Sequence, residues 1–140
     1  MIVHCNFEEL TALKSGAQQV LDGYAPEHGM IAAPPEERER VAALVPHLGG
    51  DFSVTTLAEQ RSLLQGVTII VEMLRVEMES MVGANHPAHE VAVSAYFDFA
   101  HAFSVQSRLS EIGLEMEALV ELVTGGPITD EIARDFAFSD

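Results

Sequence analysis

The feature that most constrains the fold is an apolar stripe that repeats every three or four residues between His89 and Val123. Its members are Val91, Ala95, Asp98, Ala102, Val105, Leu109, Ile112, Met116, Leu119 and Val123. This spacing places all of these side chains on one face of an α-helix, with Asp98 as the polar member. The N-terminal half of the stretch is wider, because it also carries the aromatic residues Tyr96, Phe97, Phe99 and Phe103. We therefore expect this helix to be buried on more than one side and to form the core of the fold.

A second long helix is predicted over about residues 56–82. Thr56 followed by Glu59 is typical of a capping box at a helix start. The main apolar seam of this helix consists of Leu64, Val67, Val71, Leu74, Met78 and Met81. A tight connection containing Pro87 leads to the final long helix, at about 88–123, so the two should form an antiparallel hairpin. The face opposite the seam carries Ile69, Met73 and Val76, which we predict to be an interface with a partner.

Shorter elements complete a predicted all-α bundle. Asn6 and Glu9 indicate a capping box for one N-terminal helix, and Pro35 suits the first position of the next. After the glycine pair that ends the last long helix, Thr129 indicates the start of a short C-terminal helix. Residues 2–5 are compatible with either a strand or an apolar lead-in. We expect one helical domain over residues 1–140, with 126–140 as a C-terminal appendage.

The charge balance excludes some classes of partner. The chain of 140 residues has 22 acidic and 7 basic side chains, which gives a net charge of −15. Nucleic acids and anionic membranes are bound through Lys and Arg, so neither is an expected partner. Cys5 is the single cysteine, which excludes an internal disulfide and favours a reducing compartment. With no recognisable signal peptide and no apolar run of about 20 residues, a cytoplasmic protein is expected.

Two observations predict self-association. Hydrophobic residues make up 48% of the chain and the mean hydropathy is +0.18, which are high values for a small monomer. The last long helix would measure about 50 Å if unbroken, whereas a compact domain of this length has a radius of gyration of about 14 Å. Either the helix breaks near Gly113 or it projects and pairs with another chain, and the leftover face of Ile69, Met73 and Val76 favours pairing. We predict a homodimer.

A few side chains have the chemistry of metal ligands. Asp98 and His101 form a carboxylate-x-x-His pair on the long helix, and His89 and Glu90 lie near its start. Di-metal bundles need a second such pair and two further glutamates, which are not evident in the sequence. Asp98 and His101 are equally explained as a buried hydrogen-bonded pair, or Asp98 as a residue that fixes helix register. His89 and Glu90 are equally explained by placement in the first helical turn.

Three functions follow as hypotheses. The preferred one is a non-enzymatic interaction module, a homodimer that binds another protein through an apolar helix face and needs no cofactor. The alternative is a bundle that binds a divalent metal ion or cofactor around Asp98 and His101, with the site completed across a dimer axis. The third is an acidic decoy for a basic surface. The motifs of common enzyme classes are absent, and Cys5 next to His4 lacks the surroundings of an activated thiol.

Overall fold

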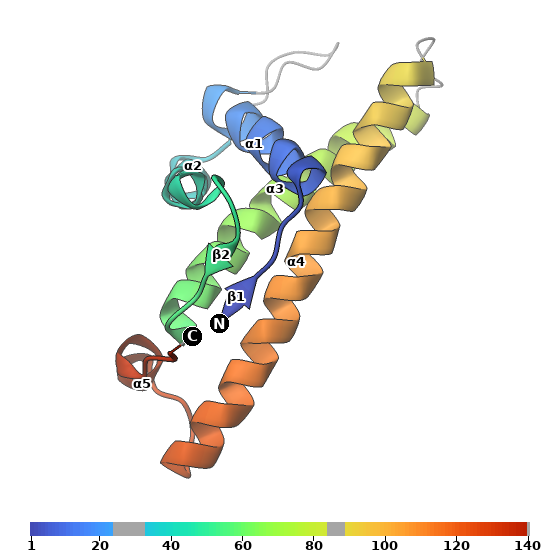
Figure 1. Ribbon diagram of the computed structural model, residues 1–140. Helices are drawn as coiled ribbons and strands as arrows, with labels where there is room; N and C mark the ends of the chain where they lie inside the picture. Colours follow the sequence, from blue (N-terminus) through green and yellow to red (C-terminus); the bar gives the residue numbers. More distant parts are fainter. Residues whose placement is uncertain (24–32, 84–88, 140) are drawn as a thin grey trace.

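The computed structural model describes residues 1–23, 33–83 and 89–139, and the prediction of an all-α bundle is confirmed (Figure 1). The helices are α1 (Phe7–Asp22), α2 (Pro35–Leu44), α3 (Leu57–Gly83), α4 (His89–Thr124) and α5 (Asp130–Asp135), with a 3-10 turn at Val45–His47. Two short strands, β1 (Ile2–Val3) and β2 (Phe52–Ser53), pair in antiparallel fashion. The tight connection predicted around Pro87 lies outside the described residues.

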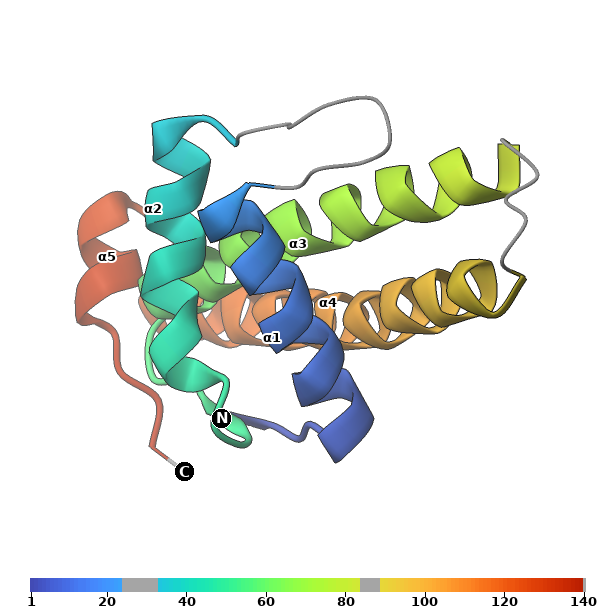
Figure 2. The same ribbon diagram turned by 90° about the horizontal axis from the view of Figure 1, so that it is seen from above.

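The two long helices pack against each other as an antiparallel hairpin, as predicted (Figures 1 and 2). Their shared core consists of fully buried aliphatic side chains, among them Val67, Leu74, Ala102, Val105 and Leu109. α4 continues without a break through Gly113, so a break there does not relieve its length. A Cβ at Gly113 would lie 2.4 Å from the side-chain nitrogen of Gln60, and this glycine therefore marks a close approach of the two helices.

The helix starts follow the capping signals in the sequence. The side chain of Asn6 accepts a hydrogen bond from the Glu9 amide at 2.8 Å, and the Glu9 carboxylate accepts one from the Asn6 amide at 2.9 Å. α2 begins at Pro35. At α3, the Thr56 hydroxyl accepts from the Glu59 amide at 3.1 Å, while the Glu59 carboxylate accepts from Thr55 at 3.2 Å. The reciprocal half of this second box is thus made by the preceding threonine.

The remaining segments lie against one end of the hairpin. β1 pairs with β2, with Val3 opposite Phe52, and both of these side chains are buried. Residues 2–5 therefore contain a strand, and β2 was too short for the sequence to indicate. α5 packs against α3, where Ala133 is buried and the Phe138 amide donates to the Thr55 carbonyl at 2.7 Å. The C-terminal segment is thus part of the packed structure.

One expectation about α4 is wrong. Its buried face consists of Ala95, Ala102, Val105, Leu109, Met116 and Val120. Tyr96, Phe97 and Phe103 are exposed by 55%, 53% and 50%, so the N-terminal half of α4 is not buried on all the sides that its aromatic residues suggested. Figure 1 shows the reason, because α1, α2 and the strands lie to the left of α4, and among the described elements only the end of α3 emerges on its right, near the top.

Candidate protein interface

A groove of about 430 Å³ opens between α1, α2 and α3. Its apolar wall consists of Val20 from α1, Pro34 at the start of α2, and Ile69, Met73 and Val76 from α3. Ile69 and Met73 are half-buried and Val76 is 53% exposed. The structure thus brings together the three residues that the sequence suggested as a partner interface, and places them in a concave site.

Glycines allow close contacts between the helices that surround this groove. A Cβ at Gly16 of α1 would lie 2.4 Å from the Ile70 side chain, and one at Gly66 of α3 would lie 3.1 Å from the Leu44 side chain of α2. Only a missing side chain allows helices to approach this closely. α1 and α2 therefore both pack tightly on α3, and the groove forms where the three helices diverge.

Polar groups are few in the groove and lie at defined places. Glu37 and Glu72 contribute carboxylates, and Glu72 is also ion-paired with Arg75. The side-chain oxygen of Gln19 is buried and has no hydrogen-bond partner among the described residues. A buried acceptor without a partner is costly. A ligand with a hydrogen-bond donor would relieve this cost.

A second exposed apolar surface runs along α4. We name it the α4 strip and define it by Val93, Tyr96, Ala100, Phe103, Ser107, Ser110 and Leu114. Val93 is 36% and Leu114 67% exposed, in addition to the exposed rings of Tyr96 and Phe103. The strip contains no charged residue. From the sequence, the aromatic members of the strip were expected to be buried. The pattern that could have identified the strip is the lack of charged residues at this three- and four-residue spacing.

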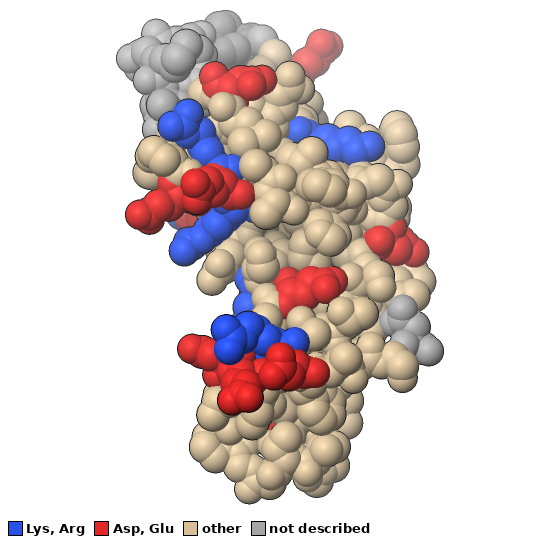
Figure 3. Space-filling model, turned by 90° about the vertical axis from the view of Figure 1, so that its left-hand side faces the viewer, with Lys and Arg blue, Asp and Glu red and all other residues tan. Residues whose placement is uncertain are grey.

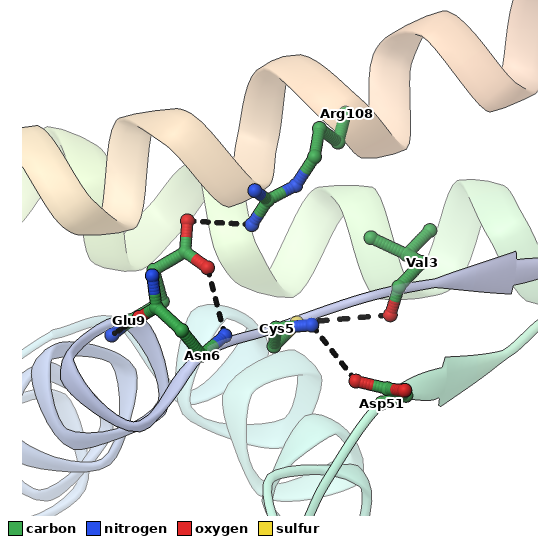
Figure 4. Close-up of polar contacts among 6 residues, drawn as sticks. All are labelled: Val3, Cys5, Asn6, Glu9, Asp51 and Arg108. Atoms are coloured by element: carbon green, nitrogen blue, oxygen red, sulfur yellow. Dashed lines mark hydrogen bonds and ion pairs between the residues drawn. The ribbon is translucent and has the colours of Figure 1, made fainter.

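A polar network fixes α1 to the middle of α4 (Figure 4). The Arg108 guanidinium donates to the Glu9 carboxylate at 2.5 Å, and the Glu9 side chain is only 4% exposed. Burial would raise the pKa of Glu9, but the hydrogen bond from the Asn6 amide and the nearby Arg108 charge outweigh it and lower that pKa. A single carboxylate thus caps α1 and anchors it to α4.

Cys5 lies beside this network but has no feature of a reactive thiol. Burial raises its pKa to about 11, so the thiolate is scarce at neutral pH. The neighbouring His4 binds Asp51 instead, with 2.8 Å between its ring nitrogen Nδ1 and the carboxylate. The Cys5 amide donates to the same carboxylate at 2.9 Å. The arrangement ties the N-terminal strand to the residue before β2.

The candidate metal ligands are spread along the N-terminal half of α4. Asp98 is half-buried, and burial raises the pKa of its carboxyl group while the nearby His101 partly opposes this effect. Glu90 is exposed, and the side chain of His89 lies outside the described part of the chain. Among the described side chains, no group of three or more His, Cys, Asp or Glu is placed to hold a metal ion.

Charge is unevenly distributed over the surface. In Figure 3, basic and acidic side chains lie next to each other mainly along the left edge of the view. Wide areas of the rest of this face carry no charged side chain. On α3, Arg75 is ion-paired with both Glu72 and Glu79. In the described ranges, no helix combines the length and the apolar character needed to cross a membrane.

Comparison of the chain with protein-family models, curated proteins and solved structures found no match.

Proposed function

We propose that this chain is a non-enzymatic helical interaction module, a homodimer that binds another protein through the groove formed by α1, α2 and α3. The observation that carries the proposal is the groove itself, which is concave and has an apolar wall that is accessible at Ile69, Met73 and Val76. Apolar pockets with a few placed polar groups are the usual form of binding sites.

The chemistry of the groove defines the partner that it would fit. The aliphatic wall suits two or three apolar side chains from one face of a helix or from an extended segment. The carboxylates of Glu37 and Glu72, on a chain of net charge −15, favour a partner with Lys or Arg flanking those apolar residues. A backbone amide or side-chain donor of the partner would satisfy the oxygen of Gln19.

A direct test is a titration with a synthetic amphipathic helix that has leucines on one face and lysines at its ends. Methyl NMR signals of Ile69, Met73 and Val76 are expected to shift together, while those of the α4 residues Val105 and Leu109 stay in place. Met73→Glu should weaken binding by about tenfold or more, because a carboxylate is costly to bury in an apolar site.

The matched control is Ser62→Glu, which adds the same charge to an exposed position of α3 outside the groove. This variant should bind the peptide as the unaltered chain does. Equal loss of binding in both variants would show that net charge governs the interaction, and unshifted methyl signals would refute the groove as the site. Native mass spectra of protein purified without chelator would report bound metal at the same time.

A further inference from the structure

We infer that two copies of this chain associate through the α4 strip, side by side and antiparallel, about a two-fold axis close to Val105. The inference rests on the homodimer of the proposed function and names the surface on which it forms. This surface borders the groove on α3, where Thr68 and Glu72 belong to both, but it does not include the apolar wall of Ile69, Met73 and Val76.

The first argument is charge. Two copies with a net charge of −15 each repel one another, so contact is favoured where charge is absent. Between Val93 and Leu114, the ends of the strip, the charged side chains of α4 are Asp98, Arg108 and Glu111. None of them belongs to the strip, since Arg108 points to α1 and Asp98 lines a pocket shared with the end of α3. The strip is therefore a long uncharged surface on a strongly acidic chain.

The second argument is the symmetry of the strip. Its residues from Tyr96 to Leu114 are separated by intervals of four, three, four, three and four, a series that is the same in both directions. An antiparallel copy centred on Val105 therefore places Tyr96 opposite Leu114, Ala100 opposite Ser110, and Phe103 opposite Ser107. Each Phe103 ring near the centre therefore faces a small side chain, which leaves room for it to insert as a knob between residues of the facing helix.

The third argument comes from α3, whose solvated side continues the same face. The hydrogen bond from Gln106 to Thr68 (3.1 Å) and the ion pair of Arg61 with Glu117 (3.4 Å) lie along the edge where α3 and α4 meet. The polar residues that follow this edge on α3 are Arg61, Gln65, Thr68, Glu72, Arg75 and Glu79, again at intervals of four, three, four, three and four.

An antiparallel copy of α3 centred on Ile70 would place Arg61 opposite Glu79, which are oppositely charged. Because Thr68 is bonded to Gln106, the midpoint of the α3 series lies at nearly the same level as Val105. A single axis therefore suits both helices. The resulting assembly is a four-helix bundle made of two hairpins.

The available area is sufficient for such a dimer. The face is about 30 Å long at about 1.5 Å per residue, and about 20 Å wide because packed helices lie about 10 Å apart. This is on the order of 600 Å² per copy, so the two copies together exceed the total of about 1,000 Å² that a specific interface should bury. The same geometry keeps the Asp98 and His101 pairs of the two copies apart, so it does not complete a shared metal site.

The decisive experiment compares two glutamate substitutions in the full chain by sedimentation equilibrium. Phe103→Glu places two like charges next to the axis and should raise the dimer dissociation constant about 100-fold or more, because unpaired buried charges are strongly disfavoured. Phe97→Glu is the matched control, since Phe97 is equally exposed on the same helix but lies outside the strip. Both variants should keep the helical circular dichroism of the unaltered chain.

The antiparallel arrangement has its own test in a Cys5→Ser background. Mixing the Ala100→Cys and Ser110→Cys proteins under oxidising conditions should give the mixed disulfide. A predominance of Ala100→Cys homodimers would instead overturn the antiparallel pairing.

A dimer that survives Phe103→Glu would overturn the strip but leave the proposed homodimer, whereas an unaltered chain that is monomeric at tens of micromolar would overturn both. Peptide binding in the groove is measured separately, so a failure of the groove and a failure of the α4 strip can be told apart.

Discussion

The groove and the α4 strip are both exposed apolar surfaces, but they differ in how they are built. The groove is concave and depends on three helices, two of which are held on α3 by glycine contacts at Gly16 and Gly66. The strip is convex and belongs to one helix, so no packing outside α4 is needed to form it. A concave surface suits the side chains of a partner, whereas a convex, uncharged one suits another helix. Damage to α1 or α2 should therefore affect the groove and spare the strip.

The largest effect is expected from closing the gap between α1 and α3. Gly16→Val would place a side chain where the Ile70 methyl group lies 2.4 Å from the Cβ position, and overpacking of this kind costs about 3 kcal/mol. Denaturant unfolding should show this loss, and peptide binding in the groove should weaken with it. Gly50→Ala is the control, because no atom lies within 4 Å of its Cβ position. An unchanged midpoint in Gly16→Val would contradict the close helix contact.

A smaller loss is expected when α1 is detached from α4. Glu9→Gln removes the charge that binds Arg108 and should lower the free energy of unfolding by about 2 kcal/mol at neutral pH. Because the folded state lowers the pKa of Glu9, its contribution is present above the unfolded value and is lost as pH falls through the folded one. The difference between the two proteins should thus shrink below about pH 4.5. A difference that is constant from pH 7 to the acid range (about pH 3) would argue against the ion pair.

The cap of α1 alone should contribute less. Asn6→Ala removes the acceptor for the Glu9 amide while leaving Arg108 in place, and loss of such a cap costs about 1 kcal/mol. Thermal unfolding of this variant should lie between those of Glu9→Gln and the unaltered chain. A loss as large as that of Glu9→Gln would mean that the cap, and not the link to α4, dominates.

The smallest effect is expected outside both surfaces. Phe97→Ser replaces a ring that is 53% exposed with a small side chain. Substitutions at exposed positions usually change stability by less than about 0.5 kcal/mol. Neither sedimentation nor peptide binding should change. A loss of several times this size would show that Phe97 is covered in solution and that the strip is wider than its definition.

Local rules in the sequence predicted most of the fold. Capping boxes at Asn6 and Thr56, Pro35 at a helix start and the long apolar seams depend on neighbours in the chain, and the structure confirms the elements that they define. The helix break considered at Gly113 does not occur. The glycine is needed there because the Gln60 side chain of α3 occupies the space of a Cβ atom. The aromatic residues of α4 were misjudged for a similar reason. Periodicity shows how wide an apolar face is, but which side is covered depends on where α1 and α2 fold back.

The candidate sites follow the same division. Ile69, Met73 and Val76 were recognisable as a leftover face of α3 because they repeat at helical spacing. Their partners Gln19, Val20 and Pro34 come from segments distant in the chain, and no local pattern links them to α3. The ion pair of Glu9 with Arg108 joins residues 99 positions apart, and was invisible for the same reason.

The contact between Gln60 and Gly113 has a consequence for how the hairpin can slide. The Gln60 amide nitrogen donates to the Leu109 carbonyl at 2.8 Å, directly over the position where Gly113 lacks a side chain. A shift of one helical turn along α4 would bring Leu109 or Glu117 under Gln60, and neither leaves space for its amide group. The two helices of the hairpin can therefore pack in only one longitudinal alignment. Whatever binds its outer face meets the side chains of α3 and α4 at a constant offset.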